Sequence, residues 1–255
     1  APLVIKPFIS KMTNSELMAV MTGGFATVAG GVMAIYVGML QDIPGIAGHL
    51  MAASIMSAPA ALVIAKIMYP EENQDNINTE IDIQSNDDKE NILEALGNGA
   101  TDGLRLAANI AAMLIAFVAL ISLTNYILSM AGTSLEVILG YIFMPLAFLM
   151  GAPWSDAGIL GSLLGQKLVL TELVAYKNLS AMEVGGLNGI SEKTAILASY
   201  ALCGFANFAS IGIQLGGIGS IAPERKKDLA KLVTKAMFGG ALASWLTATI
   251  AGILI

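Results

Sequence analysis

One carboxylate lies within an otherwise apolar part of the sequence. Glu172 separates two short apolar stretches, residues 159–170 and 173–179, and neither is long enough to cross a bilayer alone. Together they favour a helical hairpin with Glu172 at its tip. An ionisable group at membrane depth is costly, so it usually faces a cavity, where it can accept hydrogen bonds from a substrate or relay a proton. The alternative is a structural carboxylate paired with Lys167 or Lys177.

Two neutral polar side chains extend this first candidate site. Asn207 and Ser210 are three residues apart, so they share one face if their helix is intact. Amide and hydroxyl groups both donate and accept hydrogen bonds, and Phe205 can shape the same opening. With Glu172 they form a set that suits a neutral polyhydroxylated ligand. Asn and Ser also hold membrane helices together, and the sequence leaves that interpretation open.

A repeated phrase identifies a second candidate site. Residues 24–29 read Gly-Phe-Ala-Thr-Val-Ala, and residues 204–209 read Gly-Phe-Ala-Asn-Phe-Ala. A duplicated membrane unit with broken, polar helix centres is typical of transporters with a site near the midplane. An unwound turn would offer the Thr27 hydroxyl and the Val28 carbonyl to a monovalent cation. The alternatives are a Thr27 hydroxyl bonded to its own helix and glycines that only allow close helix packing.

The composition is that of a membrane protein. Of the 255 residues, 56% are hydrophobic and only 13% are charged, and the mean hydropathy is +0.73. Soluble domains carry about 25% charged residues. The segments long enough to span about 30 Å of hydrocarbon as helices are residues 17–40, 43–69, 103–131, 194–223 and 236–255. The sequence therefore predicts an all-α polytopic membrane protein.

The charges are concentrated in two places. The net charge is −6, and eight acidic residues lie between Glu71 and Glu90. This polar loop, residues 70–91, does not imply a basic partner. Five of the 13 basic residues fall between Arg225 and Lys235. Since cytoplasmic loops carry an excess of Lys and Arg, we expect this loop to face the cytoplasm.

Motifs of enzymes are missing from the sequence. There is no glycine-rich loop that ends in Lys-Ser or Lys-Thr, which phosphate binding of that type requires. The single histidine, His49, has no candidate nucleophile nearby in the sequence. The single cysteine, Cys203, cannot form an internal disulfide. We therefore expect no catalytic site, no metal site beyond the coupling cation, and no nucleic-acid partner.

The predicted elements divide the chain into four parts. Residues 1–69 hold a short hairpin arm, a broken helix and the following helix, and residues 70–91 form the acidic loop. Residues 92–153 hold an amphipathic helix, a linking span and an interfacial helix. Residues 154–255 repeat the order of hairpin, broken helix and last helix. This layout predicts an inverted-repeat transporter with re-entrant hairpins and broken transmembrane helices.

Two helix starts have local signals. Thr13 or Asn14 can cap the first long helix, with Glu16 reaching back in a capping box. Ser155 or Asp156 can cap the first arm of the hairpin.

These motifs resemble those of the concentrative nucleoside transporter family, in its bacterial sodium-coupled form. The hairpin tip reads Thr-Glu-Leu-Val-Ala-Tyr at 171–176, and residues 204–211 read Gly-Phe-Ala-Asn-Phe-Ala-Ser-Ile. The family carries Asn/Thr-Glu-Phe-Val-Ala-Tyr and Gly-Phe-Ala-Asn-x-x-Ser-Ile. The first residues, Ala-Pro-Leu-Val, match the segment that follows Gly-Gln-Thr-Glu in the family's first hairpin. The resemblance covers all 255 residues and implies a C-terminal fragment, without the scaffold helices and the base-contacting motif.

The resemblance implies a role for each candidate residue. The ribose hydroxyls would be contacted by Glu172, Asn207 and Ser210. The pocket would be lined by Phe205 and Val32.

The resemblance also implies a sodium site. Thr27 and Val28 match the broken helix that supplies sodium ligands in the family. Thr27 stands where sodium-coupled members carry Ser, and Thr171 stands where Asn is frequent. Both replacements keep a side-chain oxygen.

The implied function is sodium-coupled import of nucleosides such as uridine. The resemblance implies a homotrimer in the inner (plasma) membrane that works by an elevator-type movement, with Na⁺ as coupling ion and no other cofactor. The alternatives are coupling to protons and a non-coupled channel or receptor of the same fold. A membrane-embedded enzyme ranks last, because it would need paired catalytic groups and the sequence offers one isolated Glu.

Overall fold

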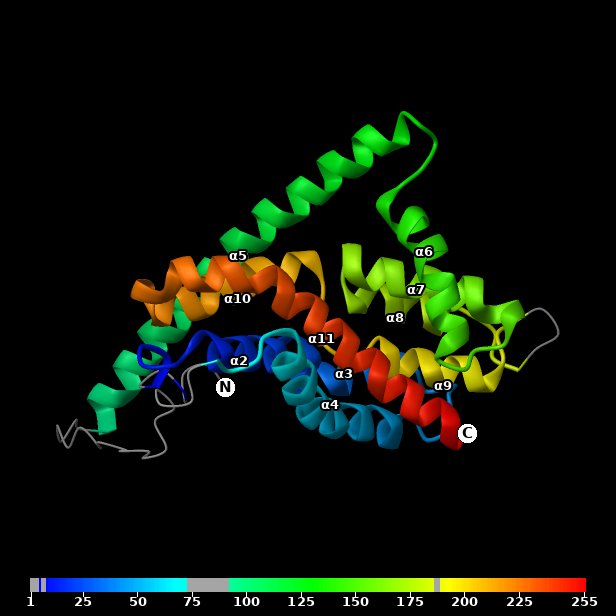
Figure 1. Cartoon of the computed structure of the whole chain (residues 1–255), viewed down its shortest axis with the longest axis horizontal. Coiled ribbons are helices and arrows are strands. Elements are labelled where there is room, and N and C mark those ends of the chain that lie inside the picture. Colours follow the sequence, from blue (N-terminus) through cyan, green and yellow to red (C-terminus); the bar gives the residue numbers. More distant parts are fainter. Residues whose placement is uncertain (1–4, 6–7, 73–91, 186–188) are drawn as a thin grey trace.

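The computed structural model describes residues 5, 8–72, 92–185 and 189–255, and within them the chain is helical with no β-strand (Figure 1). In chain order the helices are α2 (Asn14–Ala26), α3 (Gly30–Met39), α4 (Ile46–Met68), α5 (Ile92–Ser129), α6 (Leu135–Leu149), α7 (Trp154–Val169), α8 (Glu172–Ser180), α9 (Glu192–Ala201), α10 (Phe208–Ile221), the short 3₁₀ helix η2 (Pro223–Arg225) and α11 (Lys226–Leu254). Most of the predicted acidic loop lies outside the described residues.

Both predicted breaks are present. In the first repeat α2 ends at Ala26 and α3 begins at Gly30, and the backbone between them is extended. In the second repeat α9 ends at Ala201 and α10 begins at Phe208. Each unwound turn falls on the repeated phrase, so the sequence located both breaks correctly.

The capping box at the start of α2 is also confirmed. The Glu16 amide donates to Oγ1 of Thr13 over 3.1 Å, and the Thr13 amide donates to the Glu16 carboxylate over 2.8 Å. Thr13, rather than Asn14, is therefore the capping residue. The two bonds satisfy backbone donors that would otherwise have no partner at the helix start.

The predicted hairpin is formed by α7 and α8, which pack against each other and are joined at Leu170 and Thr171. Helix α6 lies along α7 with the two backbones in close approach. A Cβ at Gly161 would lie 2.7 Å from the Gly140 carbonyl oxygen, and one at Gly165 would lie 2.8 Å from that of Glu136. Small residues at such a contact are the usual device for close packing of membrane helices.

Three segments of the described chain are long and apolar enough to cross a membrane: Asn14–Met39, Ile46–Met68 and Pro223–Leu254. The expected span 194–223 is instead interrupted by the second break. The expected span 103–131 lies in α5 up to Ser129, where the helix ends, and the apolar part of this helix is Ile115–Ser129.

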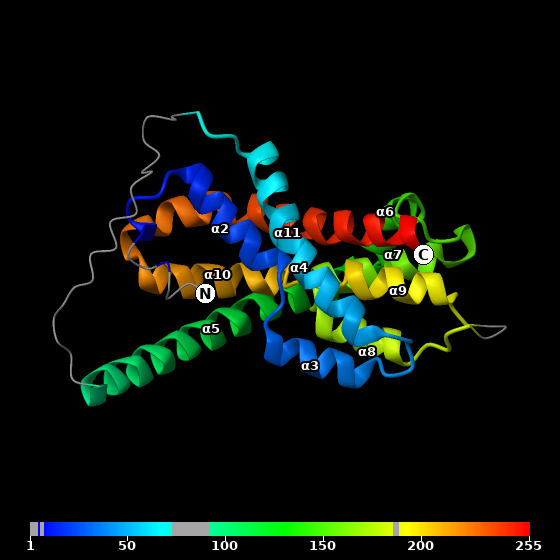
Figure 2. The same cartoon turned by 90° about the horizontal axis from the view of Figure 1, so that it is seen from below.

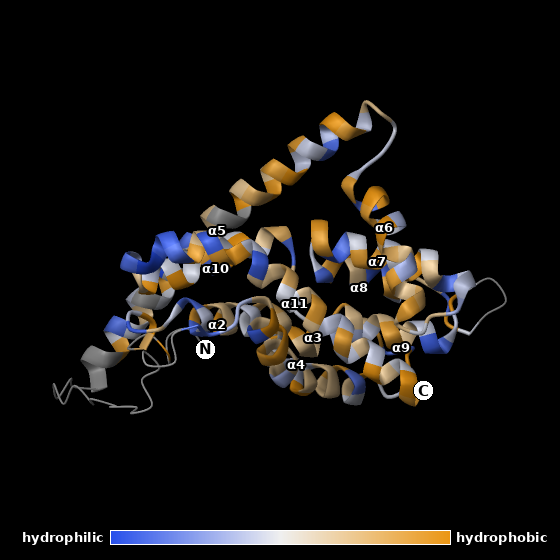
Figure 3. Ribbon diagram, in the orientation of Figure 1, coloured by the Kyte–Doolittle hydropathy of each residue, from blue (hydrophilic) through white to orange (hydrophobic). Residues whose placement is uncertain are grey.

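Several helices consist largely of hydrophobic residues, drawn in orange in Figure 3. Exposed large hydrophobic side chains include Ile55 and Ile67 on α4, Leu123 on α5, and Tyr141 and Ile142 on α6. Exposed large apolar side chains in such number are typical of a membrane or protein contact, in agreement with the predicted polytopic membrane protein.

Helix α11 is the centre of the arrangement, since it packs on α2, α4, α9 and α10 (Figure 2).

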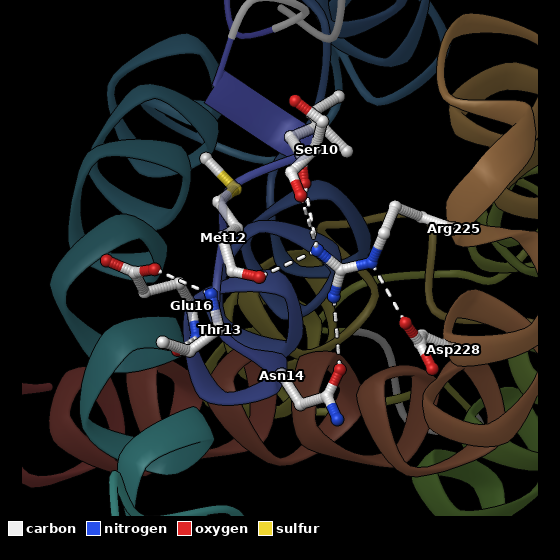
Figure 4. A network of polar contacts seen from close by, with 8 residues as sticks. Ser10, Met12, Thr13, Asn14, Glu16, Arg225 and Asp228 are labelled. Carbon is white, nitrogen blue, oxygen red and sulfur yellow. Dashed lines mark hydrogen bonds and ion pairs between the residues drawn. The ribbon is translucent and has the colours of Figure 1, made fainter. Parts of the chain in front are cut away.

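Arg225, at the start of α11, connects the first described segment to this helix (Figure 4). Its guanidinium donates to the carbonyl oxygens of Ile9, Ser10 and Met12 and to Oδ1 of Asn14, and pairs with Asp228 over 2.9 Å. At least one charge of the predicted basic loop therefore has a structural role.

Neither Ser155 nor Asp156 caps α7, contrary to the prediction. The cap position is Pro153, which forms no side-chain cap. The Asp156 carboxylate instead accepts from the Ser191 amide (3.0 Å), the Ser191 hydroxyl (2.6 Å) and the Thr194 hydroxyl (2.8 Å), at the start of α9. The sequence could not show this because the partners lie more than 30 residues away. The contact fixes the base of the hairpin to α9.

This carboxylate should make stability depend on pH. Burial acts to raise the pKa of Asp156, but the hydrogen bonds from Ser191 and Thr194 outweigh it and hold the pKa below its ordinary value. Asp156 lies outside the three candidate spans. The ionised Asp156 therefore stabilises the folded state fully above about pH 4, the ordinary pKa of an unfolded Asp. This stabilisation is lost as the pH falls through the lower pKa of the folded state.

We expect Asp156→Asn to lower the thermal unfolding midpoint of the full-length protein at neutral pH, by a stability loss of about 1–2 kcal/mol. The difference from the wild type should shrink on acidification, as measured by unfolding scans between neutral pH and pH 3. A difference that is the same at every pH would contradict this role.

Candidate functional site

The hairpin tip places Glu172 at the start of a helix. Thr171 is the N-cap of α8, and its hydroxyl accepts a hydrogen bond from the Val174 amide. Glu172 is therefore the first helical residue, and its side chain is 3% exposed. A negative charge is stabilised at a helix N-terminus, where backbone N–H groups have no intrahelical partner.

The carboxylate of Glu172 joins the hairpin to both broken helices. The Tyr36 hydroxyl, from α3, donates to Oε1 over 2.9 Å. The Asn207 amide, from the second break, donates Nδ2–H to Oε2 over 2.9 Å. An ionised carboxylate has about four acceptor positions, and these two bonds leave others for a ligand. The carboxylate therefore has acceptor capacity beyond these two contacts, of the kind that a hydroxyl donor would use.

Asn207 and Ser210 come together through a helix cap. Asn207 is the N-cap of α10, and its Oδ1 accepts from the Ser210 amide over 2.7 Å. Both side chains are buried, at 1% and 3% exposure. The sequence suggested that the two residues share one face of an intact helix. The helix begins only after Asn207, so the cap, and not a shared helix face, brings them together. One end of this amide fixes the helix start and the other holds Glu172.

The two expected pocket residues lie in or next to the two breaks. Phe205 is within the second break and Val32 is in the first turn of α3. Both are half-buried against the hydrophobic core.

Tyr36 was missed by the sequence analysis. It lies in an apolar helix, and its partner is 136 residues further along the chain. One signal was available: a buried tyrosine normally finds a hydrogen-bond partner for its hydroxyl. That rule shows that a partner is needed but does not identify Glu172.

Lys167 does not form the ion pair that the alternative interpretation of Glu172 required. Its side chain is buried, and Nζ donates to the carbonyl oxygens of Ala201 (3.0 Å) and Cys203 (3.5 Å). These carbonyls lie where α9 ends, and a positive charge is favourable at a helix C-terminus. Lys177 is exposed. In the described part of the chain the recorded partners of Glu172 are thus neutral donors.

The second candidate site is the break between α2 and α3. The Thr27 hydroxyl donates to the Gly23 carbonyl oxygen over 2.9 Å, which is the back-bond that the sequence left open as an alternative. The same hydroxyl oxygen retains lone pairs, and the unwound backbone that follows adds carbonyl oxygens. Oxygen atoms at the C-terminal end of a half-helix are the usual ligands of Na⁺ in transporters of this type, so the residues present fit a monovalent cation.

The two breaks touch each other. Gly204 has φ of 107°, and a Cβ at this position would lie 2.6 Å from the Ala26 carbonyl oxygen and 2.9 Å from that of Phe25. The Cys203 carbonyl, next to it, also accepts from the Ser244 hydroxyl of α11 over 2.6 Å. The unwound turn that carries Asn207 is therefore held by neighbours on several sides.

We expect Gly204→Ala to destabilise the full-length protein, because the new Cβ needs both a disfavoured backbone conformation and a shift of the α2 backbone. The conformational part alone costs about 1–3 kcal/mol. Gly151→Ala is the matched control, since Gly151 has the same φ of 107° but its Cβ would meet its nearest neighbour at 3.7 Å. Unfolding midpoints should fall further for Gly204→Ala, and equal shifts would show that the contact of the two breaks is unimportant.

A helical hairpin with a buried carboxylate at its tip, placed between two interrupted helices, defines a class of protein. Discontinuous helices that meet at a polar site are the construction of secondary membrane transporters. The fold and the site therefore assign the chain to this class.

Comparison with known proteins identifies the family. Residues 49–252 match the family model described as the Na⁺ dependent nucleoside transporter C-terminus. The chain belongs to this family, which is one of nucleoside transporters and not of enzymes.

The relatives include proteins from bacteria and mammals. The uncharacterized transporter YutK of Bacillus subtilis (strain 168) is 46% identical over 263 residues, covering 100% of this chain and 63% of that protein. The sodium/nucleoside cotransporter 2 of Rattus norvegicus is 42% identical over 273 residues, covering 100% of this chain and 41% of that protein. The chain thus spans less than two thirds of the length of these relatives.

Solved structures share the fold. A variant of CNTnw in an outward-facing state superposes with a TM-score of 0.85 at 41% identity, covering 99% of this chain and 61% of that one. CNTnw in an inward-facing substrate-bound state gives a TM-score of 0.77 at 43% identity, covering 98% and 60%. The predicted transporter fold with hairpins and broken helices is confirmed.

Proposed function

We propose that the complete protein is a secondary active transporter that imports nucleosides together with Na⁺. The observation that carries the proposal is the geometry of Glu172, a buried carboxylate with two neutral donors and free acceptor positions. Such a group suits the vicinal hydroxyls of a ribose. The name of the rat relative, a sodium/nucleoside cotransporter, supports both the substrate and the ion.

In this proposal each candidate residue has a role. The ribose hydroxyls are bound by Glu172, Asn207 and Ser210, and Phe205 and Val32 line the pocket. The coupling ion is bound by the Thr27 hydroxyl and the Val28 carbonyl. The protein is a homotrimer of the inner (plasma) membrane, and the hairpin-bearing part moves as an elevator.

The proposal is tested by uridine uptake into liposomes that contain the full-length protein. An imposed inward Na⁺ gradient should drive accumulation, and other nucleosides should compete with it. Accumulation driven only by a proton gradient would retain the nucleoside and remove the sodium assignment. Equilibration without accumulation would indicate a channel. The absence of any saturable uridine uptake would contradict the nucleoside site.

A further inference from the structure

One helix connects the two candidate sites. Helix α3 begins at Gly30, directly after the unwound turn with Thr27 and Val28. Tyr36 lies six residues further along the same helix, which corresponds to about 9 Å at 1.5 Å per residue. The proposed cation site therefore directly precedes the short helix that carries the donor to the Glu172 carboxylate.

The position of α3 depends strongly on Tyr36. Among its residues, Gly30–Met39, Tyr36 is the one that the structure buries, at 1% exposure. Its ring lies against the ring of Tyr176 on α8, with centroids 4.4 Å apart, and its hydroxyl donates to Glu172 over 2.9 Å. Much of the rest of α3 is exposed, including Ile35 at 56%. Tyr36 is thus the buried side chain through which α3 contacts the hairpin, by ring packing on α8 and by a hydrogen bond to Glu172.

The second partner of Glu172 is held independently of α3. Asn207 is fixed by its cap on α10, and the turn before it is held by Lys167 and Ser244. A change in the placement of α3 therefore alters one of the two bonds to the carboxylate and leaves the other in place. The orientation of Oε1 is the part of the site that α3 can control.

We propose that Tyr36 is a positioning residue that couples cation binding to substrate binding, an inference that rests on the proposed function. A cation held by Thr27 and Val28 orders the unwound turn and so fixes the start of α3. The fixed helix holds the Tyr36 hydroxyl against Oε1, which orients the Glu172 carboxylate for the ribose hydroxyls. Without the cation the helix start is looser, and the substrate must supply the ordering itself.

Coupling of this kind is reciprocal and measurable. If the cation raises the affinity for the substrate by some factor, the substrate raises the affinity for the cation by the same factor. Typical factors lie between about 5 and 150. The proposal predicts that much of this factor passes through the hydrogen bond between Tyr36 and Glu172.

The test is the ratio of uridine dissociation constants without and with saturating Na⁺, measured by calorimetry on the full-length protein with choline as the replacement ion. The wild type should show a ratio of at least about 5. Tyr36→Phe keeps the ring and its packing on Tyr176 but removes the hydroxyl, so its ratio should fall close to 1. In Tyr36→Phe the Kd for Na⁺ should likewise become nearly the same with and without uridine.

The matched control is Tyr176→Phe. It removes a buried hydroxyl from the same ring pair, but that hydroxyl donates to the Ser199 carbonyl over 2.8 Å and not to Glu172. The control should keep the wild-type ratio even if its stability falls. A merely structural role of Tyr36 would change stability in both variants and the ratio in neither.

Three results would overturn the inference, and they have different causes. A wild-type ratio retained in Tyr36→Phe would show that coupling does not use this bond. Equal loss in Tyr176→Phe would assign the coupling to the ring packing. A wild type whose uridine affinity is high but insensitive to Na⁺ would remove the sodium assignment itself, and with it this role of Tyr36.

Discussion

Replacement of Glu172 by Gln is expected to abolish nucleoside uptake while the protein still inserts into the membrane. Glutamine has nearly the same shape, but its amide group would place N–H donors against one of the two existing donors, Tyr36 or Asn207. Hydrogen bonds to charged groups contribute about 1.5–3 kcal/mol each. In the proposed complex two ribose hydroxyls donate to this carboxylate, and loss of both bonds corresponds to a decrease in nucleoside affinity of about a hundredfold or more.

Uptake should be measured at equal amounts of inserted protein, with monodispersity in detergent as the check on folding. Glu192→Gln is the control, since Glu192 is an exposed carboxylate in the first turn of α9. It should transport normally. Normal uptake by Glu172→Gln would remove Glu172 from the site.

The second large effect is expected for Asn207→Asp. Aspartate is as good an N-cap as asparagine, so the bond from the Ser210 amide and the start of α10 should be kept. The donor to Glu172, however, is replaced by a second carboxylate oxygen at the position that now lies 2.9 Å from Oε2. Two carboxylates at that distance repel each other in a buried site, where water cannot screen them. Substrate binding at neutral pH should be lost.

Asn207→Ser separates the charge from the lost donor, because serine also caps a helix but is too short to reach Glu172 and carries no charge. Its affinity for uridine should fall by about tenfold or more, the effect of losing one hydrogen bond to a charged group. Asn207→Asp should bind more weakly than Asn207→Ser. Equal affinities in the two variants would show that Glu172 and Asn207 do not face each other during binding.

The sequence predicted the parts of the fold that depend on local chemistry. The breaks after Ala26 and Ala201 follow from glycine-rich, polar phrases within apolar segments, and the hairpin follows from Glu172 between two stretches too short to span. The capping box of Thr13 and Glu16 is a local pattern as well. Each of these features is set by residues within one or two helical turns.

The features that the sequence could not predict depend on distant contacts. Tyr36 carries no polar signal in an apolar helix, yet it donates to a carboxylate on another element. Asp156 and Lys167 were assigned local partners, whereas the structure places them against the start of α9 and the end of α9. Hydropathy and spacing do not record which helix ends meet, and charged groups within a membrane protein are satisfied by such ends.

The most direct test of the central claim, that Glu172 binds the ribose hydroxyls, compares uridine with 2′,3′-dideoxyuridine. Both dissociation constants are measured on the full-length wild type and on Glu172→Gln, in saturating Na⁺. The wild type should prefer uridine by about tenfold or more, as expected when hydroxyls donate to a carboxylate. In Glu172→Gln the preference should be clearly smaller, because the carboxylate that accepts from the hydroxyls is gone and only Asn207 and Ser210 remain to distinguish the two ligands. An undiminished preference for uridine in Glu172→Gln would contradict the account.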